Sequence, residues 1–138
     1  MIDKAAFSLE SYVFNKVSID MVPNEEGGTL DLEFQPSGAF TQSEKHSSFE
    51  LQFGFVAKKQ DSEVVKINCK AVFKFAGSIA FEEIPAYFYR NSIAIIFPYV
   101  RAFVSTVTLQ ANMLPILLPT INLSSLEPRL RENTKELK

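Results

Sequence analysis

The chain has 138 residues, of which 46% are hydrophobic and 22% charged, and its formal net charge is -2. This length and composition predict a single domain, residues 1-138, that buries a sizeable core, and they exclude a largely disordered chain. The small net charge gives no global attraction to nucleic acid or to an acidic membrane, so we expect no nucleic-acid partner.

Residues 1-6 do not contain the uninterrupted apolar segment and cleavage site of a secretory signal, so we expect a cytoplasmic protein. The chain has one histidine, His46, and one cysteine, Cys69. A single cysteine forms no internal disulfide, and the alternating segment around Cys69 predicts an ordinary buried thiol. One His and one Cys are too few for a zinc site or a Cys/His nucleophilic pair. We therefore expect no metal, no cofactor and no catalytic residue, and an enzyme is the minority hypothesis.

Apolar and polar residues alternate in the first part of the chain. The segment 7-21 alternates with an interruption around Asn15-Lys16, which predicts a long strand with a bulge or bend. The Pro-, Glu- and Gly-containing segment 23-28 predicts a turn. Residues 30-34 then alternate apolar and acidic side chains, which predicts a second strand with one face in water, ended by Pro36.

Two more strands follow in the same style. Residues 49-55 place four aromatic or aliphatic side chains on one face, and the polar segment 58-62 predicts a turn. Residues 65-75 place apolar side chains on one face and Lys66, Lys70 and Lys74 on the other. Four successive strands with polar turns predict an antiparallel meander, and its apolar face needs a cover.

A helix predicted after Asn91 can provide that cover. Apolar residues recur at steps of three and four from Ile93 to Val107, which indicates a helix with one buried face. Asn91 or Ser92 suits its N-cap, and Pro98 removes one helical hydrogen bond and so predicts a kink.

After Asn112 the helical pattern ends, because Pro115 and Pro119 exclude helix from an almost wholly apolar segment, residues 114-123, which we call the strap. No charge occurs between Arg101 and Glu127. A transmembrane interpretation nevertheless fails, since the prolines and scattered polar side chains would leave polar groups unsatisfied in hydrocarbon. We expect no stable membrane insertion, and a strap that is either buried or kept as an adhesive surface. Residues 127-138 are strongly charged, which predicts a frayed tail.

Two motifs in this region resemble the SecB family of protein-export chaperones: Phe97-Pro98-Tyr99-Val100-Arg101 in the helix, and Thr120-Ile121-Asn122-Leu123 followed by Leu126. The chain departs from the family at Ala111-Asn112, where the family has glycine, and Asn112 suits that place because it tolerates the left-handed conformation. It also departs at Pro119, which stands one residue ahead of the family proline. Strand lengths and order fit the family over nearly the whole chain.

The resemblance implies an α+β fold, a four-stranded antiparallel sheet with a long kinked helix and a short C-terminal helix on one side. It also implies a tetramer, a dimer of dimers, in which grooves beneath the strap bind unfolded chains. The chain has more hydrophobic residues than one sheet face and one helix can bury. A monomer would therefore expose an unusually large apolar patch, which favours an oligomer or a bound client that covers it. The implied peptide-binding residues are Leu30, Leu32, Phe34, Leu117, Leu118, Ile121 and Leu123.

The export branch of this family docks the translocation ATPase SecA through acidic positions on the outer face of the sheet. Two of those positions correspond to Lys16 and Lys66, and only Asp20 remains acidic. Because two reversals of sign turn attraction into repulsion, we expect weak or absent SecA docking. The lysines, Lys70 included, either solubilise the face by pairing with Asp31, Glu33 or other acids across the strands, or form a docking surface for an acidic partner.

The favoured function is therefore an ATP-independent chaperone, a holdase, with unfolded or pre-export polypeptides as clients. One alternative is a module that binds a lipid or another apolar small molecule in an internal cavity. Others are a chaperone dedicated to an antitoxin of a toxin system, and a structural protein whose strap only cements an oligomer.

Overall fold

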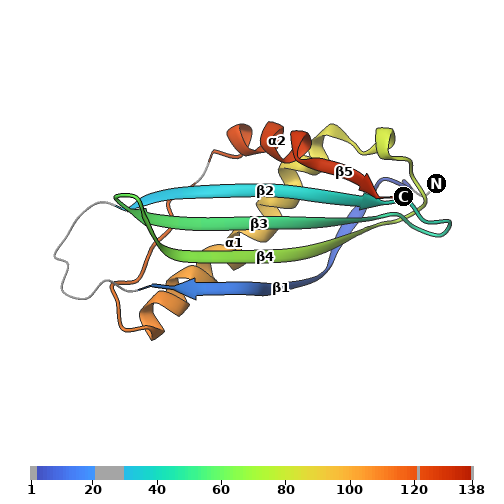
Figure 1. Cartoon of the computed structure of the whole chain (residues 1–138). Coiled ribbons are helices and arrows are strands. Elements are labelled where there is room, and N and C mark those ends of the chain that lie inside the picture. Colours follow the sequence, from blue (N-terminus) through green and yellow to red (C-terminus); the bar gives the residue numbers. More distant parts are fainter. Residues whose placement is uncertain (1–2, 21–29, 121, 138) are drawn as a thin grey trace.

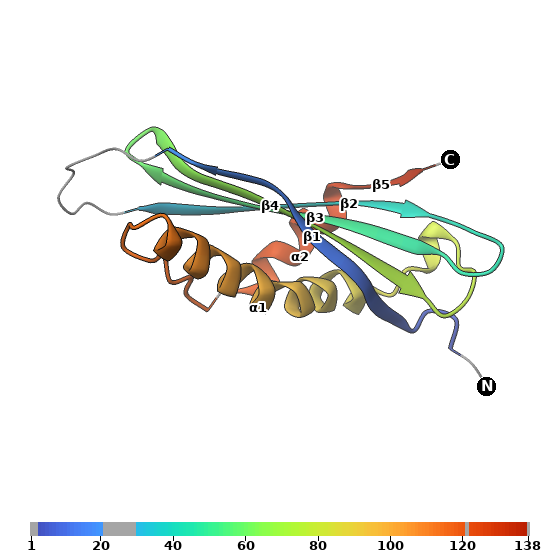
Figure 2. The same cartoon turned by 90° about the horizontal axis from the view of Figure 1, so that it is seen from below.

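The computed structural model describes residues 3-20, 30-120 and 122-137. It has the predicted α+β class, with a twisted sheet whose one face carries both helices (Figures 1 and 2). The helices are α1 (Ala86–Gln110) and α2 (Leu123–Glu132). The strands are β1 (Phe7–Ile19), β2 (Asp31–Thr41), β3 (Ser48–Lys59), β4 (Ser62–Phe75) and β5 (Thr134–Leu137).

The prediction of a four-stranded antiparallel meander was wrong in two respects. The described strands form a five-stranded sheet in the order β1-β4-β3-β2-β5, so β1 lies beside β4 instead of β2. The fifth strand, β5, runs parallel to β2 and makes the sheet mixed. Alternation in a sequence reports which side chains share a face, but it does not report which strand is the neighbour. The consecutive antiparallel pairing of β2, β3 and β4 agrees with the prediction.

The bulge predicted in β1 is confirmed. The register of β1 on β4 shifts between Phe14 and Lys16, where Asn15 is the extra residue, and shifts once more between Leu9 and Ser11. Each extra residue reverses the side-chain alternation. As a result Tyr12 shares a face with Leu9, whereas the apolar Val13 stands on the opposite face, 51% exposed.

Pro36 does not end β2, contrary to the prediction. The backbone oxygen of Pro36 accepts a hydrogen bond from Asn133 Nδ2 at 3.3 Å, on the edge away from β3. The backbone nitrogen of Gly38 points to the same edge and donates to the Asn133 oxygen at 3.2 Å. Because the nitrogen of Pro36 also faces this edge, its missing N–H removes no bond to β3, and the strand continues to Thr41.

Of the charged tail that we predicted to fray, residues 127-132 lie in α2 and residues 134-137 form β5, while Lys138 lies outside the described residues. Leu130 is fully buried, and its backbone oxygen accepts a 2.6 Å hydrogen bond from Thr134 Oγ1. The next residues pair with β2 from Gly38 to Thr41. The charged side chains of the tail's described residues therefore belong to a helix that packs on the sheet and to an edge strand that pairs with β2.

An aromatic core fills the space between the sheet and α1. Phe88, in the first turn of the helix, places its ring centroid 4.7 Å from that of Phe49, 5.0 Å from Phe75 and 5.7 Å from Phe73, and all four side chains are buried. The thiol of Cys69 is also fully buried, as predicted, and burial raises its pKa to about 11.

Helix α1 begins earlier than predicted. Its N-cap is Pro85, so Asn91 and Ser92 lie inside the helix instead of capping it. The burial of Phe88 and Tyr89 explains the difference, because packing stabilises a helix end that no side chain caps. The helix continues through Pro98, where the kink stays a prediction, and Asn112 adopts the predicted left-handed conformation with φ of 63°.

By length and composition alone, α1 is apolar enough to cross a membrane. In this structure, however, one face of α1 packs against the sheet and is part of the hydrophobic core. The residues of that face are Ile93, Ile96, Val100 and Val104, all fully buried.

Candidate functional site

A groove of about 550 Å³ lies between the edge of β2 and helix α2, and we call it the β2–α2 groove. Apolar side chains from both elements meet in it, with charged and polar groups beside them. The lining residues are Leu32, Glu33, Phe34, Asn122, Ser125, Leu126 and Arg129.

Strand β2 supplies the apolar wall because it is a strand near the edge of the sheet. Leu32 and Phe34 point to the helix side of the sheet and are half-buried. The Phe34 ring lies 5.6 Å from Phe53 and from Phe55, and 6.0 Å from Phe97. The core thus holds one side of this ring and leaves another side accessible in the groove.

Helix α2 supplies the opposite wall, and local hydrogen bonds fix where it starts. Asn122 is the N-cap: its Oδ1 accepts from the Ser124 backbone nitrogen at 3.0 Å, and its backbone oxygen accepts from Ser125 Oγ at 2.8 Å. Leu126, one turn later, is buried against the core. This start presents Ser125 and Arg129 to the groove.

The strap contains both buried and exposed apolar residues, the two environments that its sequence allowed. Ile116 and Leu118 are buried, whereas Leu114 is 89% exposed and Leu117 is 73% exposed. A buried threonine of α1, Thr108, holds the strap in place. Its Oγ1 donates to the Val104 oxygen at 2.7 Å and accepts from the Ile116 backbone nitrogen at 3.0 Å.

The structure distributes the predicted peptide-binding residues over several environments. Leu32 and Phe34 line the groove, while Leu30 and Leu123 are half-buried against the core outside its lining. Leu117 is exposed on the strap, Leu118 belongs to the core, and Ile121 lies outside the described residues. Sequence reasoning had not placed the following residues in the site: Glu33, Leu114, Asn122, Ser125, Leu126 and Arg129.

A signal for the α2 wall was present in the sequence. Asn122 is a typical N-cap residue, and Leu126 and Leu130 are four residues apart, so they share a helix face. The same helical spacing places Ser125 and Arg129 together on the neighbouring face of the helix. The short C-terminal helix implied by the resemblance is confirmed as α2, but its residues had not been assigned to the site.

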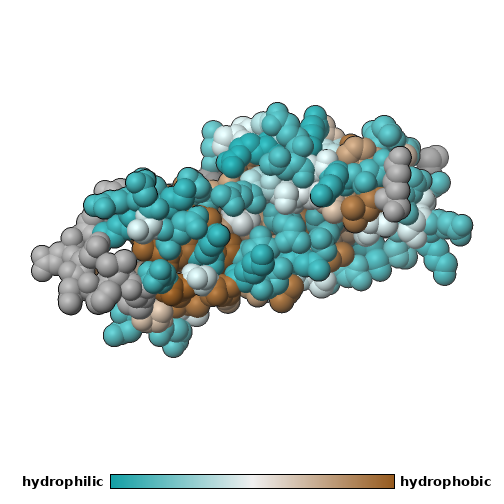
Figure 3. Space-filling model, viewed as in Figure 1, coloured by the Kyte–Doolittle hydropathy of each residue, from teal (hydrophilic) through white to brown (hydrophobic). Residues whose placement is uncertain are grey.

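The predicted docking residues lie on or beside the outer face of the sheet, away from the helices. Hydrophilic groups cover most of this face (Figure 3). Lys66 pairs with Glu63 at 3.5 Å and Lys70 with Glu50 at 3.1 Å, and Asp20 follows the end of β1. Lys74 pairs with Glu10 at 3.3 Å, and Glu33 pairs with Lys58 at 3.3 Å. Lys70 and Lys74 therefore pair with acids of the neighbouring strands, as the solubilising interpretation predicted, whereas Lys66 pairs with an acid of its own strand.

Within the described ranges, no three His, Cys, Asp or Glu side chains lie close enough together to hold a metal ion. Burial raises the pKa of Tyr89, and the nearby guanidinium of Arg131, 4.8 Å from the ring centroid, acts in the opposite direction. Both residues lie outside the lining of the β2–α2 groove.

Comparisons with known proteins identify the fold. The solved SecB-like chaperone Rv1957 of Mycobacterium tuberculosis, in complex with a ChAD peptide from the Rv1956 HigA1 antitoxin, matches with a TM-score of 0.62 and 18% identity. That match covers 86% of this chain and 89% of the solved one. A protein of unknown function from Streptococcus agalactiae matches with a TM-score of 0.55 and 15% identity, over 83% and 98% of the two chains.

A sequence relative matches a shorter stretch. The uncharacterized protein MJ0357 of Methanocaldococcus jannaschii is 48% identical over 46 residues, which are 33% of this chain and 30% of that protein. No protein-family model matches the chain. The structural matches confirm the predicted SecB-like resemblance at the level of the fold.

Proposed function

We propose that this chain, which has a SecB-like fold, is a non-enzymatic, ATP-independent holdase of the cytoplasm that binds extended segments of unfolded polypeptides. One observation carries the proposal: half-buried Leu32 and Phe34 line a groove that is open to solvent. A client side chain that enters such a groove gains roughly 1.5 to 3 kcal/mol from burial of its apolar surface.

The exposed leucines of the strap support the same function. Leu114 and Leu117 present apolar surface that the fold does not use, although Thr108 ties the strap in place. A fixed apolar surface binds many sequences because it contacts side chains without directional hydrogen bonds. Several such surfaces on one oligomer would act on one long client by avidity. Binding of the unfolded state alone opposes aggregation by mass action.

A dedicated client is the second candidate. The SecB-like neighbour was solved with a peptide from an antitoxin, and this favours a chaperone of an antitoxin over a general export chaperone. The lysines at positions 16 and 66, on the outer face, favour the same choice, since they oppose docking of SecA through acidic positions. A client panel that includes an antitoxin and a pre-export protein separates the two roles.

The cavity binder is the weaker alternative. Phenylalanine rings fill the space between sheet and helix, and both described clefts of about 550 Å³ lie at the surface. A small apolar ligand would need an enclosed site to bury most of its surface. The surface position of the clefts favours an extended polypeptide instead.

Aggregation of a chemically denatured client tests the proposal. We expect equimolar protein, without nucleotide, to suppress light scattering of the diluted client. A Leu114→Ser, Leu117→Ser double variant should suppress it severalfold less, because it removes exposed apolar surface without changing the core. The matched control is Val13→Ser, which removes a half-exposed apolar side chain from the outer face of the sheet.

Unchanged scattering at every ratio of protein to client would overturn the holdase function. Equal losses in the strap variant and in Val13→Ser would show that general surface hydrophobicity, and not the strap, binds the client. Circular dichroism of each variant confirms that the fold is retained.

A further inference from the structure

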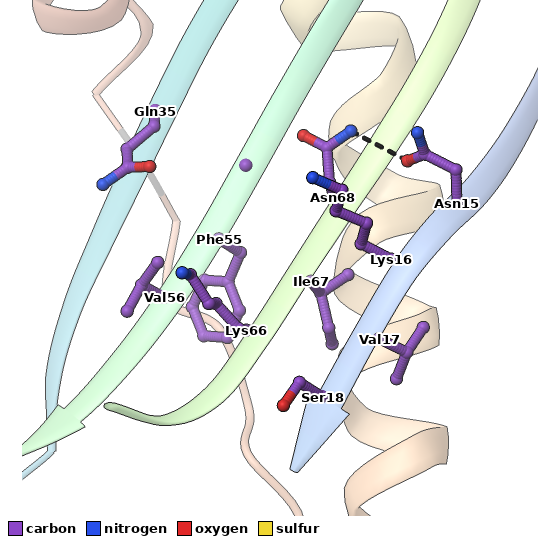
Figure 4. Close-up of a pocket in the computed structure, with 11 residues that line it drawn as sticks. Asn15, Lys16, Val17, Ser18, Gln35, Phe55, Val56, Lys66, Ile67 and Asn68 are labelled. Carbon is purple, nitrogen blue, oxygen red and sulfur yellow. Dashed lines mark hydrogen bonds between the residues drawn. The ribbon is translucent and has the colours of Figure 1, made fainter. Parts of the chain in front are cut away.

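A second cleft, also of about 550 Å³, crosses the outer face of the sheet. It involves four strands, from β1 through β4 and β3 to β2, and Figure 4 shows the side chains that line it. Because the helices cover the other face, this cleft is separate from the apolar surfaces assigned above to client binding. It is called here the Gly54 cleft.

The sheet register explains why the face is hollow at this point. One row of outward positions runs across the strands from Lys16 through Asn68 and Gly54 to Gln35. Gly54 has no side chain, so the row has a gap in its middle. A Cβ added at Gly54 would meet its nearest atom, the Gln35 backbone oxygen, at 3.4 Å, which is ordinary contact. The glycine therefore leaves a gap that the packing around it does not require.

Polar groups of fixed orientation surround the gap. Asn68 Nδ2 donates to Asn15 Oδ1 at 2.8 Å and to Gln52 Oε1 at 2.6 Å, which holds its amide in one orientation. Lys66 and Lys16 line the same cleft, from β4 and β1. The cleft thus offers two ammonium groups beside a row of amides (Figure 4).

These two ammonium groups are the lysines of the outer face with the weakest internal pairing. Lys16 makes no ion pair with a described residue, and Lys66 meets Glu63 at 3.5 Å with both side chains largely exposed. By contrast, Lys70 and Lys74 have carboxylates at 3.1 Å and 3.3 Å. Exposed pairs of this kind contribute little, so a ligand competes with Glu63 for Lys66 at small cost.

We propose that the Gly54 cleft docks an acidic segment of a partner polypeptide, with a carboxylate of that segment held between Lys16 and Lys66. Charge complementarity selects this occupant: the cleft carries two cations that the fold does not neutralise fully, while the whole chain has a net charge of -2 and so no general attraction for anions. Gly54 leaves room for the carboxylate above the sheet, where the side-chain amide of Gln35 can donate to it, whereas both N–H groups of the Asn68 amide already donate to Asn15 and Gln52. This docking is independent of client binding by the β2–α2 groove and the strap.

Fluorescence anisotropy with a labelled glutamate-serine peptide tests the proposal. Length-matched glutamine-serine and lysine-serine peptides serve as probes of charge. We expect only the acidic peptide to bind, and binding to weaken with salt because exposed charges are screened. A Lys16→Gln, Lys66→Gln variant should bind about tenfold more weakly, the size expected for two exposed charge contacts.

The matched control is Lys70→Gln, Lys74→Gln, which removes the same charge from the same face outside the cleft. It should bind the peptide like the unmodified protein. Gly54→Val, which places a side chain in the gap without backbone strain, should weaken binding while every lysine is kept.

Equal losses in the two lysine variants, or no preference for the acidic peptide, would overturn the proposal. A labelled single-stranded oligonucleotide that binds more tightly than the peptide, and loses its affinity in Lys16→Gln, Lys66→Gln, would overturn the choice of a polypeptide partner. Client aggregation measured on the same variants should be unchanged, so failure of this proposal and failure of the holdase function are distinguishable.

Discussion

Leu117 and Leu118 are adjacent in the strap, yet their environments are opposite. Leu117 is 73% exposed, whereas Leu118 is 1% exposed and packs in the core. Both are leucines in the same apolar segment, so composition and local pattern do not distinguish them. The neighbouring hydrogen bond from Ile116 to Thr108 sets the orientation of the strap and therefore which leucine turns inward.

We predict that Leu118→Ala lowers the free energy of unfolding by about 2 to 5 kcal/mol, because it leaves a cavity in the core. Leu117→Ala should change it by less than about 0.5 kcal/mol, as is usual for an exposed side chain, and should weaken client binding. Urea denaturation measures the first effect and aggregation suppression the second. Similar losses of stability in both variants would contradict the orientation of the strap.

At the scale of elements, helix α2 shows how a few local interactions build one wall of a site. It has only ten residues, and its sequence contains Pro128. So short a helix is marginal by itself, and it depends on its N-cap and on the burial of Leu126 and Leu130. The first turn that Asn122 caps also presents Ser125 to the groove.

We predict that Asn122→Ala costs about 1 kcal/mol of stability, since the Ser124 backbone nitrogen loses its partner. It should also weaken client binding, because fraying of the first turn displaces one wall of the groove. Asn122→Asp preserves the acceptor and is the control, expected to retain both properties. Urea denaturation and client aggregation are measured on both variants, and equal behaviour of the two would show that the cap does not position α2.

For the whole molecule, the face of α1 away from the sheet has no covering element in the described chain (Figure 2). Ile95 and Leu109 are exposed on α1, and exposed Tyr99 lies at the side of the helix, where its ring is 4.6 Å from that of Tyr12 on β1. Several exposed apolar side chains on one helix are typical of a subunit interface. The tetramer that the SecB-like resemblance implies stays a prediction.

We predict that light scattering after size exclusion gives about four times the 15.5 kDa of one chain. Ile95→Glu with Tyr99→Glu should reduce this mass to that of a dimer or monomer without unfolding, because charges would be buried in the interface. Arg101→Glu, also exposed on α1, is the control that should keep the assembly. A monomeric unmodified protein would contradict this interface.

The sequence by itself determined the class of each long element, because apolar periodicity of two or of three to four reports which side chains share a face. It indicated β3, β4, the bulge at Asn15 and the helix end near Asn112. The motif around Phe97 and Pro98 pointed to the SecB-like fold. Each of these depends on residues that are close together along the chain.

Only the tertiary structure decided the features that depend on residues far apart in the chain. Examples are the pairing of β1 with β4, the continuation of β2 through Pro36 and the addition of β5. In each case the local sequence pattern does not specify which strand is the neighbour. The β2–α2 groove joins Leu32 to Leu126, and the Gly54 cleft joins Lys16 to Gln35 across four strands. Register and packing, which couple distant segments, create both sites.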